Sequence, residues 1–469
     1  MVKCAISRHI ASMTSPTIVW LRRDLRLEDQ AAFAAAAAAG APVIPVYVLD
    51  DDTPRHRRMG AASRWWLHHS LAALDARLRK MGSRLILKRG KCDAALAAIR
   101  RETGARTVHA LHHYEPWWRM AEKAVAKTFD LQLHHGNYLV PPGTLKTGGG
   151  QPYKIYTPFW RAAQQRLPPP EPVKAPAKLE APSFWPASDK LEDWDLLPTK
   201  PDWAGGMRKA WTPGERGAAA RLKTFVDLAS RYDATRNLPS QEGTSMLSPH
   251  LHFGELSPAM AWHAVSDAGG SVDVFLSELG WRDYGQNIIL QLPDYAAKNG
   301  RPAFDALPWR HSPKDLKAWQ QGQTGYPIVD AGMRQLWHTG WMHNRVRMIA
   351  ASFLVKHLLI DWRKGEQWFW DTLVDADYGS NATNWQWVAG SGVDANMFSR
   401  IMAPLSQSEK FDAAGYIREW VPELRKLDDA EIHDPENRPK GYPARIIEHG
   451  DARTRALEAN ATMKRESGK

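Results

Sequence analysis

The secondary-structure pattern of this 469-residue chain changes once, and that change limits the folds open to it. From Thr17 to about residue 140, short runs rich in β-branched and aromatic residues alternate with alanine-rich or amphipathic stretches of helical spacing. The runs are TIVWL, PVIPVYVLD, SRLILKR, RTVHALHH and LQLHH. This alternation predicts βαβ units, and so a doubly wound, Rossmann-like parallel sheet of five strands with helices on both faces. From about residue 213 to 424 helical spacing replaces the strand pattern, so we expect a second domain that is all helical.

Composition divides the chain further. Residues 141–213 include LPPPEPVKAPAKLEAPSFWP and show no sustained periodicity, which is typical of a long interdomain linker. The last part is charged and has little apolar content. We therefore expect an N-terminal extension at 1–15, an α/β domain at 16–140, a linker at 141–213, a helical domain at 214–430 and a charged C-terminal tail at 431–469.

The charge and the aromatic content indicate the kind of partner. A formal net charge of +11 favours a polyanion such as nucleic acid, although many basic proteins bind none. The chain also has 22 tryptophans, and basic surface with interleaved aromatic side chains suits the binding of unstacked bases. The alternative is that most of these tryptophans belong to the core.

Cysteine use and hydropathy indicate the compartment. Cys4 and Cys92 are the only cysteines, which gives neither a disulfide framework nor a metal-binding cysteine pair. No apolar run approaches the roughly 20 residues that cross a bilayer. The first residues, MVKCAISRHIAS, do not have the pattern of a secretory signal. We expect a cytoplasmic protein, in a bacterium the cytoplasm or nucleoid.

Motifs for nucleotides and metals are weak in this sequence. No G-x-G-x-x-G follows the first strand, and there is no P-loop. The histidine pairs at 68/69, 112/113 and 134/135 are adjacent rather than four residues apart, so we expect no metal there. Asp375 and Asp377 form a D-x-D pair that could hold magnesium, but aromatic residues stand where further oxygen ligands would be needed.

Three other stretches carry residues suited to a binding site. In YDATRNLPSQEGTSMLSPHLHFGELSP, the hydroxyl residues lie near expected helix starts, where they suit a phosphate or simply cap the helix. In FLSELGWRDYGQN, a glutamate and a tryptophan share one helix face. In GWMHNRVRM, an asparagine, an arginine and a methionine share a face, and Arg345 points elsewhere. Each residue taken alone is better explained by a structural role than by a binding site.

Several of these segments together resemble the photolyase/cryptochrome flavoproteins. The resemblance rests on TIVWLRRDLRLEDQ, YDATRNLPSQEGTSMLSPHLHFGELSP, the long stretch from TGYPIVDAGMRQLWHTGWMHNR to DADYGSNATNWQW, and EKFDAAGYIREWVPEL. It extends from about residue 17 to 425. Within the family the sequence is most similar to class I cyclobutane pyrimidine dimer (CPD) photolyases. The resemblance implies a DNA repair enzyme, a carbon–carbon lyase, that uses light and reduced flavin adenine dinucleotide (FAD) to split pyrimidine dimers.

The resemblance also implies positions for the cofactor. FAD would bind noncovalently in the helical domain, with Asn381 next to N5 of the flavin ring. The full set of implied cofactor-binding residues is Tyr232, Thr244, Ser245, Met246, Leu247, Ser248, Phe275, Arg347, Asp375, Asp377 and Asn381. In this reading the two aspartates contact flavin and no metal is needed.

Catalytic and DNA-binding residues follow from the resemblance in the same way. Trp385, Trp362 and Trp309 match an inner, a middle and an outer member of a chain that carries electrons to the flavin. Glu278 and Asn344 match residues that hydrogen-bond the dimer. The implied substrate- and DNA-binding residues are Arg236, Glu278, Trp281, Asn344, Arg345, Met348, Trp387 and Arg400.

The sequence departs from the family pattern at some positions. Gln30 stands where asparagine is usual, and Phe275 stands where some relatives have a tryptophan. Trp117 and Trp118 replace the asparagine and glutamate of relatives that use methenyltetrahydrofolate as an antenna, whereas Glu115 resembles the deazaflavin or flavin type. We expect a deazaflavin or flavin antenna, or a first domain without one.

Three alternatives share much of this pattern. A cryptochrome-type blue-light photoreceptor usually has a long C-terminal extension, whereas only about 40 residues follow REWVPEL. A (6-4) photolyase normally needs a histidine pair, and MHNR places Asn344 at the second position. A damage-sensing DNA-binding module would need the basic pocket but no reducible flavin. The repair reading implies ultraviolet-damaged DNA as partner, no membrane, no metal and a monomer.

Overall fold

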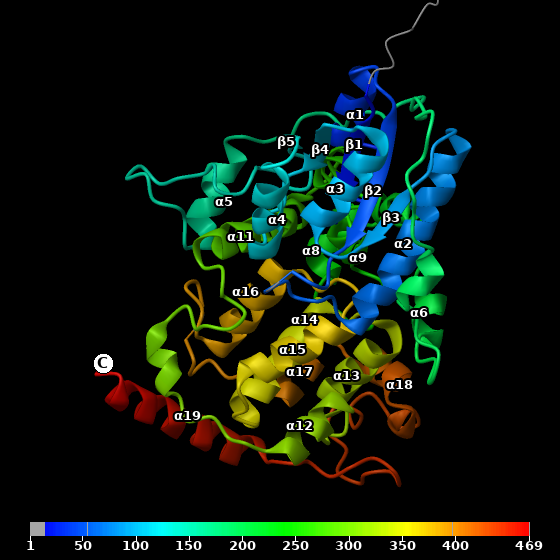
Figure 1. The fold of residues 1–469 in the computed structure, drawn as a ribbon. Helices are drawn as coiled ribbons and strands as arrows, with labels where there is room; N and C mark the ends of the chain where they lie inside the picture. Colours follow the sequence, from blue (N-terminus) through cyan, green and yellow to red (C-terminus); the bar gives the residue numbers. More distant parts are fainter. Residues whose placement is uncertain (1–14, 54, 396, 469) are drawn as a thin grey trace, which may run out of the picture.

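The computed structural model describes residues 15–53, 55–395 and 397–468 (Figure 1). The N-terminal extension expected at 1–15 lies outside these residues except for Ser15. A five-stranded parallel sheet with its helices is followed by a large helical part, which confirms the predicted fold class.

The sheet has the strand order β3-β2-β1-β4-β5, and all neighbouring strands are parallel. Ile18 of β1 lies opposite Ile44 of β2 on one side and Val108 of β4 on the other. The strands are β1 (Thr17–Leu21), β2 (Val43–Leu49), β3 (Ile86–Arg89), β4 (Thr107–Leu111) and β5 (Asp130–His134).

Alternating side chains of β1 explain why helices cover both faces of the sheet. Ile18 and Trp20 belong to a buried cluster with side chains of α3 and α4, whereas Val19 and Leu21 belong to a second cluster with side chains of α1 and α2. The connecting helices are α1 (Ala31–Ala38), α2 (Ala61–Lys80), α3 (Cys92–Thr103) and α4 (Pro116–Val125).

The segment expected as a linker follows the α/β part and includes short helices. The Val43 amide donates to the Glu180 carbonyl, and the Asp189 amide donates to the Leu87 carbonyl, so the proline-rich chain is bonded to the sheet region. Its helices are α5 (Tyr156–Gln164), a 3-10 turn (Leu191–Trp194) and α6 (Gly205–Ala210).

The helical part contains the long helix α11 (Asp273–Gln291), which packs against α16 (Tyr378–Ala389). The two helices approach closely because Gly285 and Gly379 face each other, and a Cβ on Gly379 would lie 2.8 Å from the Gly285 carbonyl carbon. The remaining α-helices are α7 (Glu215–Val226), α8 (Tyr232–Thr235), α9 (Ser248–His252), α10 (Pro258–Asp267), α12 (Pro313–Gln320), α13 (Pro327–Thr339), α14 (Asn344–Ser352), α15 (Trp362–Thr372), α17 (Pro404–Lys410) and α18 (Ala414–Trp420).

Shorter helical turns connect these elements. A π-helical turn follows α14 directly, and the other three turns of the described helical part are 3-10 helices. The turns in this part are η2 (Ala229–Arg231), η3 (Pro302–Ala306), the π-helical η4 (Phe353–His357) and η5 (Pro422–Leu424).

The charged C-terminal segment ends in a long helix, α19 (His449–Glu466), that packs against η4 and η3. Its buried side chains are Ala452, Ala456, Ala459 and Met463, which follow helical spacing. These four residues form a weak apolar pattern in the sequence, because three of them are alanines within a charged segment.

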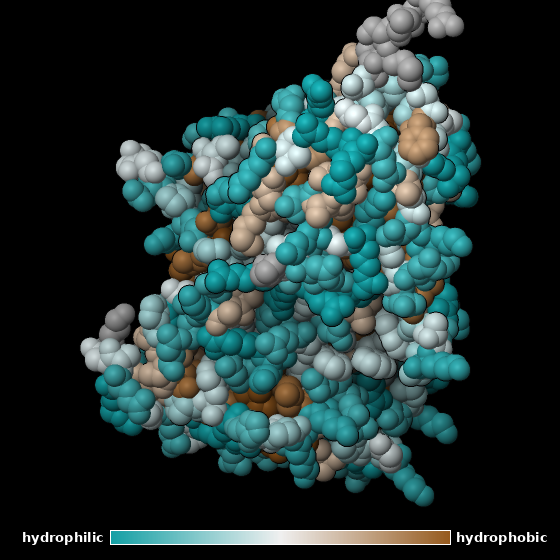
Figure 2. Space-filling model, in the orientation of Figure 1, coloured by the Kyte–Doolittle hydropathy of each residue, from teal (hydrophilic) through white to brown (hydrophobic). Residues whose placement is uncertain are grey.

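The surface in Figure 2 is mainly hydrophilic, and hydrophobic side chains occur on it in small, separate patches. Among the residues that the structure describes, no helix has the length and apolar character of a membrane span.

Candidate functional site

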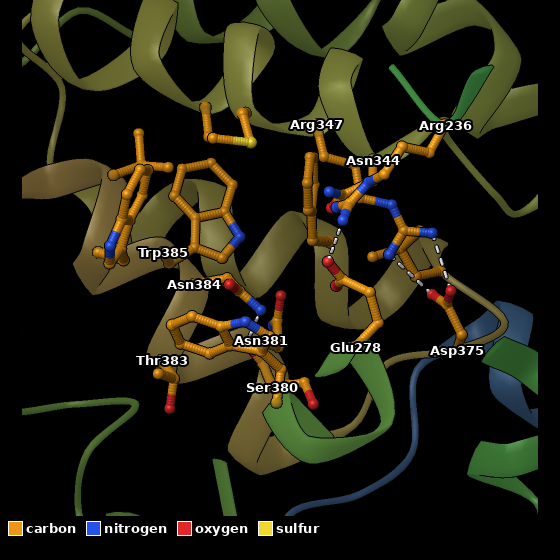
Figure 3. Close-up of a pocket in the computed structure, with 17 residues that line it drawn as sticks. Arg236, Glu278, Asn344, Arg347, Asp375, Ser380, Asn381, Thr383, Asn384 and Trp385 are labelled. Atoms are coloured by element: carbon orange, nitrogen blue, oxygen red, sulfur yellow. Dashed lines mark hydrogen bonds and ion pairs between the residues drawn. The ribbon is translucent and has the colours of Figure 1, made fainter. Parts of the chain in front are cut away.

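A cavity of about 280 Å³ opens between α11, α14, α15 and α16 (Figure 3). A second cavity of about 230 Å³ lies next to it, toward α8 and α9. Both are bounded by Glu278, Asn344, Arg347, Asp375 and Ser380. The shared walls make the two cavities parts of one elongated site.

Most residues that the sequence singled out line this site. The first cavity includes Arg236, Glu278, Trp281, Asn344, Arg347, Met348, Asp375, Asn381, Trp385 and Trp387. The second cavity adds Tyr232, Thr244, Ser245, Met246, Ser248, Phe275 and Asp377.

The other predicted residues lie elsewhere. Leu247 is fully buried in a hydrophobic cluster rather than at the cavity wall. Arg345 bonds Asn237 at 2.7 Å and lies over Phe411, in line with the helical spacing that turns it away from Arg347. Arg400 is exposed, Trp362 is fully buried and Trp309 is partly buried, and neither tryptophan is among the residues that line the two cavities.

Arg347 and Asp375 fix one another across the centre of the site. The guanidinium nitrogens lie 3.1 and 2.8 Å from the two carboxylate oxygens, and Ser248 Oγ donates to the same carboxylate at 2.6 Å. Bidentate pairs of this kind are strong and hold both side chains in one geometry. Asp375 therefore ties α9 to α14.

Asp377 is the N-cap of α16 and accepts from the Ser380 amide at 2.7 Å. Gln286 of α11 donates to it, and Arg23 of the α/β part lies 3.5 Å away. Burial alone would raise the pKa of Asp377, but the charge of Arg23 and the capping bond bring it below its usual value. Both aspartates thus have protein partners, and no group of metal-binding side chains occurs in the described residues.

Glu278 faces the first cavity from α11 and forms an ion pair with Arg236 at 2.5 Å (Figure 3). Its side chain is 33% exposed, so a ligand can reach it. Asn344, the first residue of α14, lines the same cavity. A carboxylate, an amide and a guanidinium therefore line the same cavity as the aromatic rings of Trp281, Trp385 and Trp387.

The indole ring of Trp281 stacks on the ring of Tyr156 of α5. The two rings are stacked with centroids 3.5 Å apart and an interplanar angle of 10°. Tyr284 meets the indole edge-on at 5.4 Å, and the Tyr156 hydroxyl donates to the Ser277 carbonyl at 2.7 Å. One face of Trp281 is therefore covered, while the side chain still lines the cavity.

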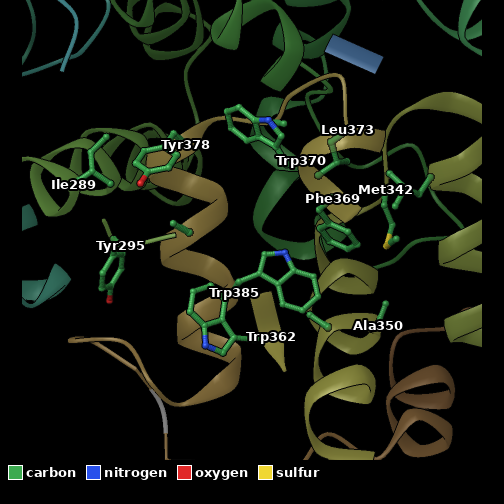
Figure 4. Close-up of a cluster of buried hydrophobic side chains, with 14 of the residues drawn as sticks. Ile289, Tyr295, Met342, Ala350, Trp362, Phe369, Trp370, Leu373, Tyr378 and Trp385 are labelled. Carbon is green, nitrogen blue, oxygen red and sulfur yellow. The ribbon is translucent and has the colours of Figure 1, made fainter. Parts of the chain in front are cut away.

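Of the three tryptophans expected to carry electrons, one lines the cavity, one is fully buried and one is partly buried. Trp385 lines the cavity, and its ring packs so closely on Gly365 of α15 that a Cβ there would lie 2.1 Å from it. Trp362 is fully buried at the start of α15, in the same cluster (Figure 4), and donates to Asn299 at 2.9 Å. Trp309 is partly buried against that cluster.

Sequence reasoning missed several wall residues. Arg282 and Ser380 directly follow or precede residues it had named, so proximity in sequence was the available signal. Among the remaining wall residues, three that resemble ordinary core residues in sequence are His252, Trp341 and Phe369.

The site fits an elongated ligand with an anionic part and a planar ring. Hydroxyls of Thr244 and Ser245 and the guanidinium of Arg282 line the second cavity, where they suit phosphate oxygens. Trp385 and Phe369 line the first cavity, where they suit a flat ring. This donor set is consistent with FAD.

A third, much smaller space of about 30 Å³ lies between the sheet and α15. Trp117 and Trp118 bound it, and His56 stacks on Trp117 with centroids 5.6 Å apart. Glu115 is fully buried nearby and forms an ion pair with Arg23.

Two family models match the sequence. The one described as DNA photolyase matches residues 17–177, and the one described as the FAD binding domain of DNA photolyase matches residues 275–462.

Individual proteins are similar over almost the whole chain. The deoxyribodipyrimidine photo-lyase of Agrobacterium fabrum is 48% identical, covering 96% of this chain and 99% of the relative. Cryptochrome-1 of Arabidopsis thaliana is 36% identical, covering 95% of this chain and 70% of the relative. A crystal structure of a class III photolyase from Agrobacterium tumefaciens superposes with a TM-score of 0.93 at 48% identity, covering 98% of this chain and 100% of that one.

Proposed function

This chain belongs to the photolyase/cryptochrome family, and we propose that it is a light-driven DNA repair enzyme that splits cyclobutane pyrimidine dimers. The proposal is carried by one observation: Glu278, Trp281, Asn344 and Trp387 line the same cavity as Trp385 and Asn381. Lesion-contacting groups and flavin-contacting groups would thus share one space. We infer class I specificity from the sequence resemblance, while one similar structure is of a class III photolyase.

FAD is the cofactor that the site would hold, with Arg347 and Asp375 at the centre and Thr244 and Ser245 at the phosphate end. When bound, reduced and excited by light, FAD would supply the electron that opens the cyclobutane ring and would take it back afterwards. The chain's own task is to bring the dimer to that electron, to exclude water and to hold the dimer carbonyls.

The dimer must leave the duplex to reach the cavity. Photolyases are among the enzymes known to extrude their target from the base stack, at a cost of a few kcal/mol that is smallest for damaged bases. Contacts with Trp281 and Trp387 would offset this, since stacking on an aromatic side chain is worth roughly 1–3 kcal/mol per base. Stacking by Tyr156 keeps Trp281 in place before the dimer arrives.

Glu278 and Asn344 would hydrogen-bond the dimer carbonyls, where negative charge develops while the ring opens. The ion pair between Glu278 and Arg236 must adjust for this contact. Arg236, Arg345 and Arg400 would bind phosphates and so position the strand without reading its sequence. Trp385, Trp362 and Trp309 would carry electrons inward to return the cofactor to its reduced form.

Several finer properties belong to the same proposal. We expect a monomer in the cytoplasm, without a metal. We expect an antenna of deazaflavin or flavin type in the α/β domain. The main alternative is a blue-light photoreceptor, which is favoured by the similarity to Cryptochrome-1 of Arabidopsis thaliana. The photoreceptor reading leaves unexplained why Glu278, Asn344 and two tryptophans line one cavity.

A repair assay with matched variants tests the proposal. Photoreduced protein is mixed with an oligonucleotide that contains one thymine dimer, and restored thymine absorbance is followed under blue light and in the dark. Repair should require light and should be lost in Glu278→Ala and in Trp281→Ala. Trp337→Ala is the control, because Trp337 is 58% exposed and does not line either cavity. Absence of repair with reduced FAD bound would favour the photoreceptor.

A further inference from the structure

Arg57 connects the α/β part to the wall of the cavity. It lies between β2 and α2, yet its guanidinium ends at Glu366 of α15. The two terminal nitrogens lie 2.7 Å from the two carboxylate oxygens, which is a bidentate pair. The guanidinium also lies over Trp370, 4.0 Å from the ring centroid. The Glu366 side chain is 1% exposed, so Arg57 is the cation that balances a buried carboxylate.

Glu366 in turn fixes the side chain of Asn381. The Asn381 amide nitrogen donates to the Glu366 carboxylate at 2.8 Å and to the Glu366 carbonyl at 3.1 Å. Both amide hydrogens are thus directed at acceptors of α15. Turning the amide over would bring its oxygen against a carboxylate and a carbonyl, so the observed orientation is strongly favoured.

Because Glu366 fixes the Asn381 amide, it also determines which atom of Asn381 faces the cavity. The side chain is 8% exposed and lines the first cavity, together with Trp385 and Ser380 (Figure 3). With its nitrogen committed to Glu366, its oxygen is the polar atom left for a ligand. Asn381 therefore offers a hydrogen-bond acceptor, not a donor.

Removal of Arg57 would undo this arrangement. A carboxylate buried without a cation is costly, and such a group becomes neutral by binding a proton. A protonated Glu366 carries its own O–H donor, which can bond the Asn381 oxygen and release the amide to turn. The cavity would then meet a donor, or a mixture of both orientations.

We propose that Arg57 is a positioning residue that acts through Glu366 to keep the Asn381 oxygen toward the cavity, and thereby stabilises the reduced form of the bound flavin. This rests on the proposed function. Reduction of a flavin by two electrons adds a hydrogen to N5, a nitrogen of its central ring. Reduced N5 then donates a hydrogen bond, whereas oxidised N5 can only accept one. An acceptor at Asn381 favours the reduced ring if that nitrogen lies against it.

The midpoint potential of bound FAD tests this role, with dithionite as the reductant in a titration followed by visible absorbance. Arg57→Met should shift the midpoint potential of FAD to more negative values. It should also speed the reoxidation of reduced FAD by air in the dark. The reoxidation rate should rise about tenfold if one hydrogen bond of roughly 1.4 kcal/mol is lost. Arg57→Lys keeps the charge but not the bidentate geometry, so its shift should have the same sign and be smaller. Arg58→Met is the control, since Arg58 is 65% exposed and approaches Asp51 instead.

A double variant separates the relay from a general structural effect. If Arg57 acts through Glu366, Arg57→Met should cause no further shift in a Glu366→Leu background. Unchanged potentials in flavin-loaded Arg57→Met and Arg57→Lys would overturn the proposal, as would an undiminished shift in the double variant. If Arg57→Met does not fold, the Lys variant decides by the same criterion. Failure of the wild-type protein to bind FAD would instead refute the proposed function.

Discussion

Replacing Tyr156 with leucine should weaken binding of damaged DNA by releasing Trp281. The two rings lie 3.5 Å apart and nearly parallel, and the hydroxyl of Tyr156 bonds the Ser277 carbonyl one turn before Trp281 on α11. An aromatic pair contributes about 0.5–1.5 kcal/mol beyond its burial. We expect the affinity for dimer-containing DNA to fall about two- to tenfold, which is the factor that corresponds to this energy.

Fluorescence anisotropy with two labelled oligonucleotides measures this effect. One carries a single thymine dimer and the other has the same sequence without damage, and both are titrated at one salt concentration. Binding of undamaged DNA should not change, because phosphate contacts dominate it. Tyr156→Phe keeps the stacked ring and should lose less affinity than Tyr156→Leu. Equal losses on both oligonucleotides, or equal losses in both variants, would refute the positioning role of Tyr156.

Three further predictions concern stability, electron supply and cofactor binding. Burial raises the pKa of Asp283 to about 7, so its contribution to stability is full below its unfolded pKa and is lost as the pH rises toward 7. Urea unfolding should show the wild type losing about 2–3 kcal/mol relative to Asp283→Asn between pH 5 and 8, and parallel curves would contradict this. Trp362→Phe should abolish photoreduction of oxidised FAD by external donors but leave repair by chemically reduced protein intact, as absorbance spectra and the repair assay would show; undiminished photoreduction would exclude Trp362 from the electron path. Asp375→Asn removes the charge that pairs with Arg347 at 2.8 Å, and FAD affinity measured by fluorescence should fall about tenfold or more, whereas unchanged affinity would show that the pair is not needed.

The fold was predictable where local pattern and burial agree. Strands β1 and β2 are buried along their whole length, so their apolar composition alone distinguishes them, whereas β5 has no fully buried residue. Helix α19 was not predictable in the same way, because alanines form its buried stripe within a charged segment. Helix α5 was not recognised either, since its aromatic residues follow a glycine-rich turn and precede a proline-rich stretch.

The site was predictable in its residues more than in its contacts. Helical spacing correctly separated Arg347, which lines the cavity, from Arg345, which bonds Asn237. The ion-pair partner of Glu278 could not be inferred from the sequence. Arg236 lies at the end of a short helix far away in the chain, where the sequence shows no strong periodicity. The ion pair between Arg57 and Glu366 joins residues 309 positions apart, and no local sequence pattern predicts such a contact.

Light-driven splitting of cyclobutane dimers in this cavity is the activity that we propose for the protein. The most direct measurement is chromatographic quantification of both cyclobutane dimers and (6-4) photoproducts in ultraviolet-irradiated DNA after incubation with reduced protein, under blue light and in the dark. We expect cyclobutane dimers to be lost under blue light and not in the dark, with (6-4) photoproducts unchanged. Dimers that persist under light with FAD bound and reduced, or selective loss of the (6-4) photoproduct, would contradict it.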